Sequence, residues 1–571
     1  MIGCGAAAAS PAVAGTENMR LSVSGETMGV YRSAMEKLDM QAWGDAKSAI
    51  LGLDQSDPMR PYLLARLYLA KNSPRTELFD LLDLLAKAPN LPQAEQISAL
   101  ATRRGAQILP DRPQVQKLMY TGGSPQRSIL SPIKGDPLAD TLAPRLAAFI
   151  KADTPLAGEM MLDTEGAGLS AACLTEARQR LAWSYYITND LANAERLALK
   201  AVAAGNGPYM APAYWVAGLS AWRQNAWGTA AMAFANVAAR ASDADLRSAG
   251  YYWAARAYMA DGKPQQVTAL LQAAAREDDS FYGLLAAETL GLSQQRLAAR
   301  PRTSDKEMRS FGGLPNVRLA QTLAALGRTT DADETLRYQA MLSGANNYEA
   351  LLHIASDLSL PRTQLWLAQR SPTGARLHPQ TRYPQPDWTP TGGYRVDRAL
   401  LMAHALQESR FQTDAVSMAG ARGVMQVRPG TAGDLAAATG EQVSAADLDN
   451  PAINMEYGQR YLESLSRSGA TGGLLAKVMA AYNAGPVPLE RWKSQIRDNG
   501  DPLLFIESVP YYETRAYVNV VMRNYWMYQL KDTGRSTALT SLAQGLWSRF
   551  PSKGTEVAVR MTPAGQAAGV D

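Results

Sequence analysis

Residues 398–432 read RALLMAHALQESRFQTDAVSMAGARGVMQVRPGTA. In the first twelve, apolar side chains recur at the three- and four-residue spacing of one helical face, at Ala399, Met402, Ala403 and Leu406. Asp397 precedes them and is a favourable N-cap. After them, Gly420 and Gly423 allow a tight turn or a short hairpin, with close approach of the backbone to a ligand. The stretch therefore predicts a helix that runs directly into a compact glycine-containing loop.

Glu408 falls at the C-terminal end of the predicted helix, at the edge of its apolar face. The negative end of the helix dipole disfavours a carboxylate there, and partial burial raises a carboxyl pKa further. A carboxyl group that stays protonated near neutral pH is what a general acid needs. Most helix-end glutamates are only solvated, so the position alone is weak evidence. His404 lies four residues earlier and can reach Glu408, but we expect a surface histidine without a catalytic role.

Further blocks follow in a fixed order. Gly423–Ala432 reads GVMQVRPGTA, Asn454–Leu462 reads NMEYGQRYL, Ala481–Pro486 reads AYNAGP and Val509–Val518 reads VPYYETRAYV. Together with Glu408-Ser409, this set closely resembles the catalytic domain of the soluble lytic murein transglycosylases. The pattern of that family is ES, GLMQxMPxTA, N(I)xxGxxYL, AYNAGPxxVxxW and IPxxETRxYV. All five blocks occur in order, so the resemblance is highly specific.

The resemblance implies a lysozyme-like, mostly α catalytic domain with a small β-hairpin. It implies that Glu408 is the single catalytic acid and base. Substrate-binding residues are expected at the matched positions Ser417, Met425, Gln426, Tyr482, Asn483 and Glu513. Tyr482 has the clearest physical case, because its ring can stack on a sugar while its hydroxyl orients a neighbouring group. Asn483 is equally suited to holding a loop, and for Arg515 we expect a structural ion pair.

Two residues depart from the family pattern. Leu406 stands where members often have Arg, and Arg428 stands where they usually have an apolar residue near the groove. We expect the activity to be retained, whereas the preference among glycan subsites stays open.

The scarcity of acidic residues suits the mechanism that the resemblance implies. A glycosidase normally uses two carboxylates about 5 to 9.5 Å apart, but residues 417–432 contain no Asp or Glu. A single acid suits a lytic transglycosylase, which cleaves the β-1,4 bond between N-acetylmuramic acid and N-acetylglucosamine without water and forms a 1,6-anhydromuramoyl product. No metal and no cofactor are expected. Two alternatives stay open: a lysozyme-type peptidoglycan hydrolase, and a non-enzymatic helical-repeat scaffold that binds glycan.

The part of the chain before this domain has a helical pattern almost throughout, from about Thr27 to Gln369. Helical hairpins rich in Ala and aromatic residues begin at Arg178, Trp215 and Trp253, 37 and 38 residues apart. Such a period is typical of stacked hairpins that form a superhelix. We expect the aromatic side chains to pack between repeats rather than to line a sugar-binding surface.

The predicted fold class is therefore all-α, with an N-terminal α-superhelix of stacked helical hairpins before the catalytic domain. Arg370–Gly393 is rich in proline and without periodicity, which marks a linker or a domain edge. The predicted segments are a leader or signal remnant (1–26), the superhelical domain (27–304), a linker domain with its Pro-rich connection (305–389), the catalytic domain (390–535) and a C-terminal tail (536–571).

Composition excludes several other classes. A length of 571 residues is too great for one compact core. A net charge of +4 is too small for a dedicated nucleic-acid binder, and two cysteines, Cys4 and Cys173, exclude a disulfide scaffold. No apolar run is long enough to cross a membrane.

The expected partners are peptidoglycan glycan strands, with cell-wall synthesis proteins as an open addition. A peptidoglycan substrate implies a periplasmic location. Ile2-Gly3-Cys4 resembles the end of a lipoprotein cleavage box, so a lipid anchor on Cys4 stays open as well.

Overall fold

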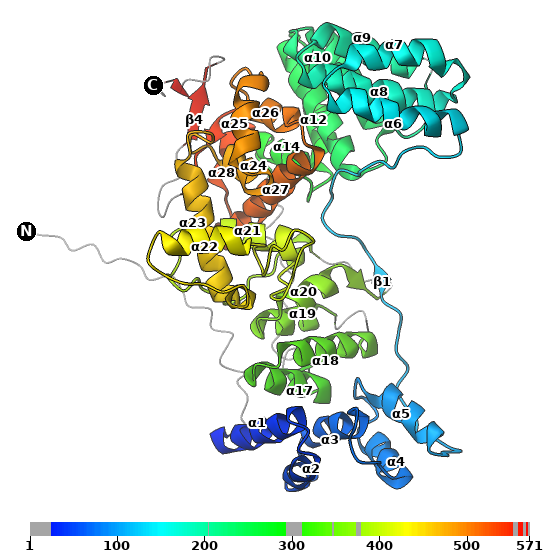
Figure 1. Ribbon diagram of the computed structural model, residues 1–571, viewed down its shortest axis with the longest axis vertical. Helices are drawn as coiled ribbons and strands as arrows, with labels where there is room; N and C mark the ends of the chain where they lie inside the picture. Colours follow the sequence, from blue (N-terminus) through cyan, green and yellow to red (C-terminus); the bar gives the residue numbers. More distant parts are fainter. Residues whose placement is uncertain are drawn as a thin grey trace, which may run out of the picture. The chain divides into compact units, whose positions relative to one another are not determined.

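The structure is a computed structural model that describes residues 24–203, 205–292, 311–344, 348–372, 378–551, 558–562 and 567–568. Helices dominate these residues, and the strands are short (Figure 1). The described residues form two compact units. The first is drawn from Met1–Gly123 and Pro301–Asp387, and the second from Ser124–Arg300 and Trp388–Asp571.

The first unit joins two helical segments that are far apart in the sequence. Its helices are α1 (Gly25–Asp39), α2 (Trp43–Leu51), α3 (Arg60–Leu69), α4 (Leu78–Lys87), α5 (Ala94–Arg103), α17 (Pro315–Ala325), α18 (Thr329–Leu342), α19 (Tyr348–Asp357), α20 (Pro361–Ala368) and the 3-10 turn η5 (Pro379–Arg382). Strand β1 (Met119–Tyr120) pairs antiparallel with β2 (Arg370–Ser371), with Met119 opposite Ser371. Both segments contribute to one apolar core, which contains Leu63 and Leu336.

The compact units do not follow the predicted domain limits. The predicted superhelix at 27–304 is divided after Gly123, and its first part packs with the predicted linker domain instead. The apolar face of a helical hairpin can be buried by any helix with a matching apolar face. A repeat pattern therefore does not determine which part of the chain packs against a given hairpin. The second change of unit falls between Asp387 and Trp388, inside the proline-rich stretch Arg370–Gly393.

The second unit begins with the stacked hairpins. Its first helices are α6 (Pro137–Lys151), α7 (Pro155–Glu165), α8 (Ala171–Ile187), α9 (Leu191–Ala203), α10 (Met210–Arg223), α11 (Trp227–Arg240), α12 (Ala244–Ala260), α13 (Val267–Ala275) and α14 (Phe281–Thr289), with 3-10 turns η2 (Gly166–Gly168) and η3 (Pro264–Gln266). The turns inside three successive hairpins place Asn189, Asn225 and Gly262 in the left-handed region, at φ 67°, 59° and 71°. These residues are 36 and 37 residues apart. Because Asn and Gly tolerate this conformation best, the turns preserve the repeat period that the sequence indicated.

Aromatic side chains fill the space between these hairpins. Trp253 is fully buried, and its ring lies 5.3 Å from Trp222, 5.5 Å from Phe234 and 6.2 Å from Trp215. The expectation that these rings pack between repeats is therefore confirmed for this cluster.

The rest of the second unit surrounds one long helix. Its elements are α21 (Arg398–Ser409), α22 (Pro429–Ala437), η6 (Asp447–Asp449), α23 (Pro451–Arg467), α24 (Leu475–Ala484), α25 (Pro486–Gln495), α26 (Pro502–Ser508), α27 (Tyr512–Thr533), α28 (Thr537–Ala543) and the strands β3 (Trp547–Ser548), β4 (Ala558–Met561) and β5 (Ala567–Ala568). The central helix is α27, which packs against α21, α24, α26 and α14. Of its 22 residues, 14 are buried, so it forms the core to which the neighbouring helices are fixed.

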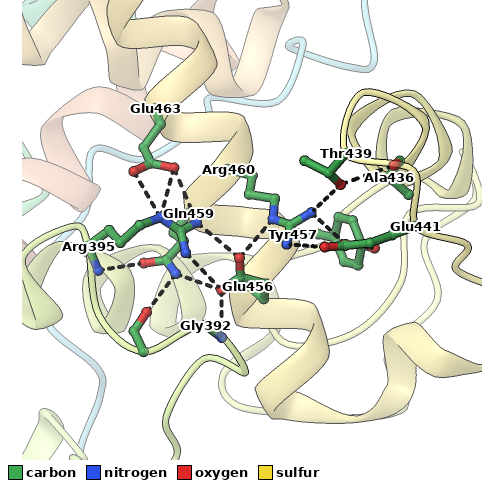
Figure 2. Close-up of polar contacts among 11 residues, drawn as sticks. Gly392, Arg395, Ala436, Thr439, Glu441, Glu456, Tyr457, Gln459, Arg460 and Glu463 are labelled. Atoms are coloured by element: carbon green, nitrogen blue, oxygen red, sulfur yellow. Dashed lines mark hydrogen bonds and ion pairs between the residues drawn. The ribbon is translucent and has the colours of Figure 1, made fainter.

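A network of charged side chains fixes α23 against the segment before α21 (Figure 2). The guanidinium of Arg395 lies 3.0 Å from Glu456 and 3.2 Å from Glu463. Arg460 bridges Glu456 to Glu441, with both ion pairs at 2.7 Å. Glu456 is 2% exposed, so its carboxylate depends on these cations. The network thereby holds the chain that leads into the helix of Glu408.

The stacked hairpins and the C-terminal helices share one interface inside this unit. Arg127, which lies in the extended segment before α6, forms an ion pair with Glu507 at 2.7 Å. The rings of Phe281 on α14 and Trp526 on α27 stack 4.8 Å apart. The helix that carries Glu408 is therefore held against a wall built by the superhelix.

Within the predicted tail at 536–571, the described residues include the helix α28 and the strands β3 to β5. Leu539 and Leu542 of α28 are buried, and Trp547 is 1% exposed, with its Nε1 donating to the carbonyl of Gly500 at 2.8 Å. The chain turns at Gly534, the C-cap of α27. This break in the helical pattern led to the prediction of a loose tail. None of the described helices has the length and apolarity needed to cross a membrane.

Candidate active site

The helix of Glu408 forms as the sequence predicts. Asp397 is its N-cap and accepts a hydrogen bond from the backbone N–H of Ala399 at 2.9 Å. The helix ends at Ser409 because Arg410 adopts a left-handed conformation, with φ at 52°, and its N–H returns to the carbonyl of Ala405. Glu408 therefore lies in the last turn, where the helix dipole disfavours its charge.

Glu408 lines a cleft of about 680 Å³. One wall comes from α24 and α27 and contains Asn483, Glu513 and Tyr517. The superhelical part also lines the cleft, with residues 126–129, Asp245 and Phe281. This arrangement places the carboxyl group of Glu408, at the end of α21, in a cleft that it shares with the carboxyl groups of Glu513 and Asp245.

The surroundings of Glu408 favour its protonated form. Burial raises the pKa of Glu408 to about 7. The hydroxyl of Tyr517 donates to Oε1 of Glu408 at 2.5 Å and lowers this pKa, whereas the charge of Glu513 raises it. The carboxyl group therefore has a pKa near the working pH, as a general acid needs.

His404 is buried, which corrects the expectation of a surface histidine. Its side chain has 0% exposure, and its Nδ1 lies 2.8 Å from the hydroxyl of Tyr517. The ring packs 4.6 Å from that of Tyr482. His404 is therefore connected to Glu408 through Tyr517.

The glycine-containing loop is compact but contains less β structure than expected. Val416 and Val427 each form an isolated bridge with Arg422, and no longer hairpin occurs in the described residues 410–428. Gly423 has φ at 73°, and an added Cβ would lie 2.2 Å from both the Nδ2 of Asn454 and the carbonyl oxygen of Leu448. The close approach at Gly423 is thus to α23 and η6.

The loop residues expected to bind substrate differ in their placement. Ser417 is half-buried and accepts a hydrogen bond from the N–H of Ala421 at 3.0 Å. Gln426 donates from Nε2 to the carbonyls of Ala415 and Gly423, at 3.2 and 3.0 Å. Both side chains therefore shape the loop.

Met425 departs from the expectation of a substrate contact. Its side chain is fully buried, and its sulfur lies where a Cβ on Gly458 would stand, at 2.4 Å. Met425 therefore packs against α23 beneath the surface of the loop, where it cannot contact glycan.

Tyr482 supports the same loop. Its hydroxyl donates to the carbonyl of Met425 at 2.8 Å, and its ring packs 5.3 Å from Tyr461. The side chain does not line the cleft, so the expected stacking on a sugar ring has no support in this arrangement.

Asn483 and Glu513 both line the cleft with Glu408. The Oδ1 of Asn483 accepts from the hydroxyl of Thr514 at 2.7 Å, which fixes the amide between α24 and α27. Glu513 is exposed. For these two residues, the cleft is compatible with direct contact to substrate.

Arg515 makes no ion pair within 4.0 Å in the part of the chain that the structure describes. Instead, it donates to the carbonyl of Val509 at 2.6 Å, and its guanidinium lies 4.3 Å from the ring centre of Trp183. The expected ion pair is therefore replaced by a cation–π contact with the superhelix.

The arrangement around Glu408 also contains a functional side chain that the sequence analysis did not single out. Tyr517 lies 109 residues after Glu408 and donates to it directly. A signal was available, because Tyr517 follows Glu513 by four residues and therefore shares its helical face.

The environment of Glu408 predicts that Glu408→Gln stabilises the protein in a pH-dependent manner. The folded-state pKa of about 7 is above the ordinary value of 4.5, so between these pH values the unfolded chain ionises while the folded protein keeps its proton. Stability is therefore lost from about pH 4.5 to pH 7, and the loss is complete above pH 7. We expect the variant to gain about 2–3 kcal/mol in unfolding free energy relative to wild type between pH 4.5 and pH 8. Urea unfolding at both pH values measures this change, with exposed Glu490→Gln as the control. An equal difference at both pH values would contradict the burial of the carboxylate.

The described residues contain no group of three or more His, Cys, Asp or Glu side chains that could hold a metal ion.

Comparison with known proteins finds similarity in the part of the chain that contains Glu408. Residues 389–505 match the family model of the transglycosylase SLT domain. The chain is 33% identical over 165 residues to the soluble lytic murein transglycosylase of Salmonella typhimurium, and 32% identical over 146 residues to that of Escherichia coli. These matches cover 28% and 25% of this chain, but only 24% and 22% of the relatives. The chain therefore matches about a quarter of the length of these relatives.

Solved structures extend the likeness to the whole fold. The 70 kDa soluble lytic transglycosylase Slt70 of Escherichia coli has a TM-score of 0.54 at 17% identity, over 92% of this chain and 99% of that chain. The lytic transglycosylase Slt of Pseudomonas aeruginosa has a TM-score of 0.51 at 19% identity, over 90% of each chain. The predicted fold class, an α-superhelix followed by a lysozyme-like domain, is confirmed, as is the resemblance to soluble lytic transglycosylases.

Proposed function

We propose that the chain is a peptidoglycan lytic transglycosylase, because residues 389–505 match the family model of the transglycosylase SLT domain. The proposed reaction cleaves the β-1,4 bond between N-acetylmuramic acid and N-acetylglucosamine and leaves a 1,6-anhydromuramoyl end. The observation that carries the proposal is Glu408, a carboxyl group with a pKa of about 7 at the wall of a large cleft. We assign Glu408 as the catalytic acid and base, Asn483 and Glu513 as substrate-binding residues in the cleft, and Ser417 and Gln426 as residues that shape the loop after α21.

In the first step, protonated Glu408 gives its proton to the glycosidic oxygen as the bond to C1 of the muramoyl unit breaks. Positive charge develops at C1, and the acetamido group of the substrate stabilises it from within the same sugar. This assistance from the substrate replaces the second carboxylate that most glycosidases use.

In the second step, ionised Glu408 removes the proton from the O6 hydroxyl of the muramoyl unit. The O6 oxygen then bonds to C1 and closes the 1,6-anhydro ring, while Glu408 returns to its protonated state. The carboxyl group thus ends the cycle as it began, and no water is consumed.

The lysozyme-type alternative uses the same first step but replaces the O6 hydroxyl with water. Its products are heavier by one water and have reducing ends, so product masses distinguish the two reactions. A non-enzymatic scaffold has less support, since a buried carboxyl with a raised pKa is costly and serves no purpose in glycan binding alone.

A peptidoglycan substrate implies that the protein acts in cell-wall turnover in the periplasm. The modest net charge of +4 suits an anionic wall polymer. The lipid-anchor alternative depends on Cys4, which lies outside the described residues. Cell-wall synthesis proteins are proposed as partners on the basis of this role.

The pH dependence of cleavage provides one test. The first step needs protonated Glu408, so kcat/KM is expected to fall as the pH rises through about 7, approaching tenfold per pH unit above that value. Muropeptide release from purified sacculi between pH 5 and pH 9 measures the profile. A profile that stays flat to pH 9 would show that Glu408 is not the acid.

A further inference from the structure

Three polar side chains stand in a line that ends at the candidate acid. His404 and Glu408 are four residues apart on α21, so they share a helical face. Tyr517 reaches between them from α27, with its hydroxyl 2.8 Å from Nδ1 of His404 and 2.5 Å from Oε1 of Glu408. Both His404 and Tyr517 are buried, at 0% and 5% exposure.

We propose that His404 is a positioning residue, whose Nδ1–H holds the Tyr517 hydroxyl as a donor to Oε1 of Glu408 and thereby reserves Oε2 for the transferred proton. This inference rests on the proposed function, because it describes how the acid of that reaction is oriented.

The number of available protons determines which group donates in each of these two hydrogen bonds. The Tyr517 hydroxyl has one proton and donates it to Oε1 of Glu408. Its oxygen can then only accept from His404, so Nδ1 of the imidazole must be the protonated nitrogen. Oε2 of Glu408 has no hydrogen-bond partner among the described residues, and the side chain lines the cleft. The acidic proton is therefore placed where the glycosidic oxygen can receive it.

Because His404 is buried, its role as the donor to Tyr517 does not change with pH. Desolvation lowers the pKa of His404 to about 3, so the ring is neutral and has a single N–H throughout the working pH range. Its Nε2 is buried without a hydrogen-bond partner in the described structure. A bare Nε2 fits this placement, because a protonated Nε2 would leave an unpaired buried donor and would remove the donor that Tyr517 requires.

Other ionisable groups around the acid have distinct roles. Tyr482 from α24 packs against the His404 ring but donates to the carbonyl of Met425. Glu513 from α27 raises the pKa of Glu408 by its charge.

The other charged side chains that line the cleft are Arg127, Asp245 and Arg523, and Arg127 lies 3.4 Å from Asp245. Among the described residues, Tyr517 alone forms hydrogen bonds with both His404 and Glu408.

The test uses variants of the full chain that separate hydrogen bonding from packing. His404→Phe keeps a ring between Tyr482 and Tyr517 but has no donor, whereas His404→Asn retains an N–H near the Nδ1 position. Since the Tyr517 hydrogen bond lowers the pKa of Glu408, a weaker bond must raise it. We expect His404→Phe to move the falling limb of kcat/KM to higher pH by about half a unit, in keeping with lost cooperativity between linked hydrogen bonds. His404→Asn is expected to restore the wild-type limb.

A double-mutant cycle assigns the effect to Tyr517. Tyr517→Phe alone should move the limb in the same direction and further, and His404→Phe should add no shift in that background. The proposal would be overturned if His404→Phe shifted the pH profile of kcat/KM equally in the wild-type and Tyr517→Phe backgrounds. It would also be overturned if His404→Phe caused no shift in either background. A shift that His404→Asn fails to reverse would overturn it as well.

The ionisation of Glu408 is also measured without substrate, by infrared difference titration of its carboxyl band, which Glu408→Gln removes. If the protein does not cleave peptidoglycan but the band shifts in His404→Phe, then the proposed function fails and the positioning role stands. If cleavage occurs and the band does not shift, the positioning role fails alone.

Discussion

Replacing Glu408 with Gln is expected to reduce the release of muropeptides from sacculi by about a thousandfold or more, a loss in the upper part of the range for general acid–base groups. Glutamine has nearly the shape of glutamate and can accept the hydrogen bond from Tyr517, but it cannot give a proton to the glycosidic oxygen. The same group also serves as the base in the second step, so both steps are affected. Product release, followed by chromatography and mass spectrometry, measures the loss.

Glycan binding by Glu408→Gln should remain, since the cleft walls are unchanged. Co-sedimentation of the variant with sacculi provides that control. Glu513→Gln is the matched substitution, because Glu513 lines the same cleft but is exposed. We expect it to retain a larger fraction of activity than Glu408→Gln. Cleavage by Glu408→Gln at a wild-type rate would contradict both the transglycosylase and the hydrolase mechanism.

Replacing Arg127 with Met is expected to destabilise the second unit by about 3–5 kcal/mol, the usual cost of removing one member of a buried ion pair. Arg127 lies 2.7 Å from Glu507, whose side chain is fully buried, and 3.4 Å from Asp245, which is almost fully buried. Its guanidinium also lies 4.9 Å from the ring centre of Trp215. Without Arg127, both carboxylates would lose their ion-pair partner, and only the more distant charges of Arg515 and Arg523 would act on them. Urea unfolding followed by tryptophan fluorescence measures the change.

Two variants separate this effect from a general loss of charge. Arg145→Met removes an arginine that pairs with Glu165 at the surface, where both side chains are about half exposed, so little change is expected. Adding Glu507→Gln to Arg127→Met should recover part of the lost stability, because the uncompensated charge is removed. A stability of Arg127→Met close to that of wild type would show that this ion pair does not secure the interface.

Local features of the fold followed from the sequence. The helix Arg398–Ser409 was predicted with both ends, since a capping Asp397 and the chain reversal after Ser409 are short-range features. The helical hairpins were predictable for the same reason, because their turns recur at fixed spacing. The division into two units was not predictable, since the pairing of α1–α5 with α17–α20 depends on contacts across about 200 residues.

The candidate site was predictable in its residue types and less so in its geometry. Every residue from Ala399 to Ala405 is buried, so a helix that looked amphipathic is covered on all sides. For this reason the prediction that His404 is a surface residue was wrong. Met425 shares a motif with groove residues, but its side chain points into the core, which a motif does not reveal. The contact of Tyr517 with Glu408 joins α21 to α27 and appears only when those helices pack.

The most direct test of the proposed reaction is the mass of the muropeptides that the wild-type protein releases from purified sacculi. A transglycosylase must release products with 1,6-anhydromuramoyl ends, because the O6 hydroxyl closes on C1 and no water is added. Reduction with borohydride should leave these ends unchanged. Products that are one water heavier, with muramic acid ends that borohydride reduces, would contradict the proposed mechanism and show that the protein is a hydrolase.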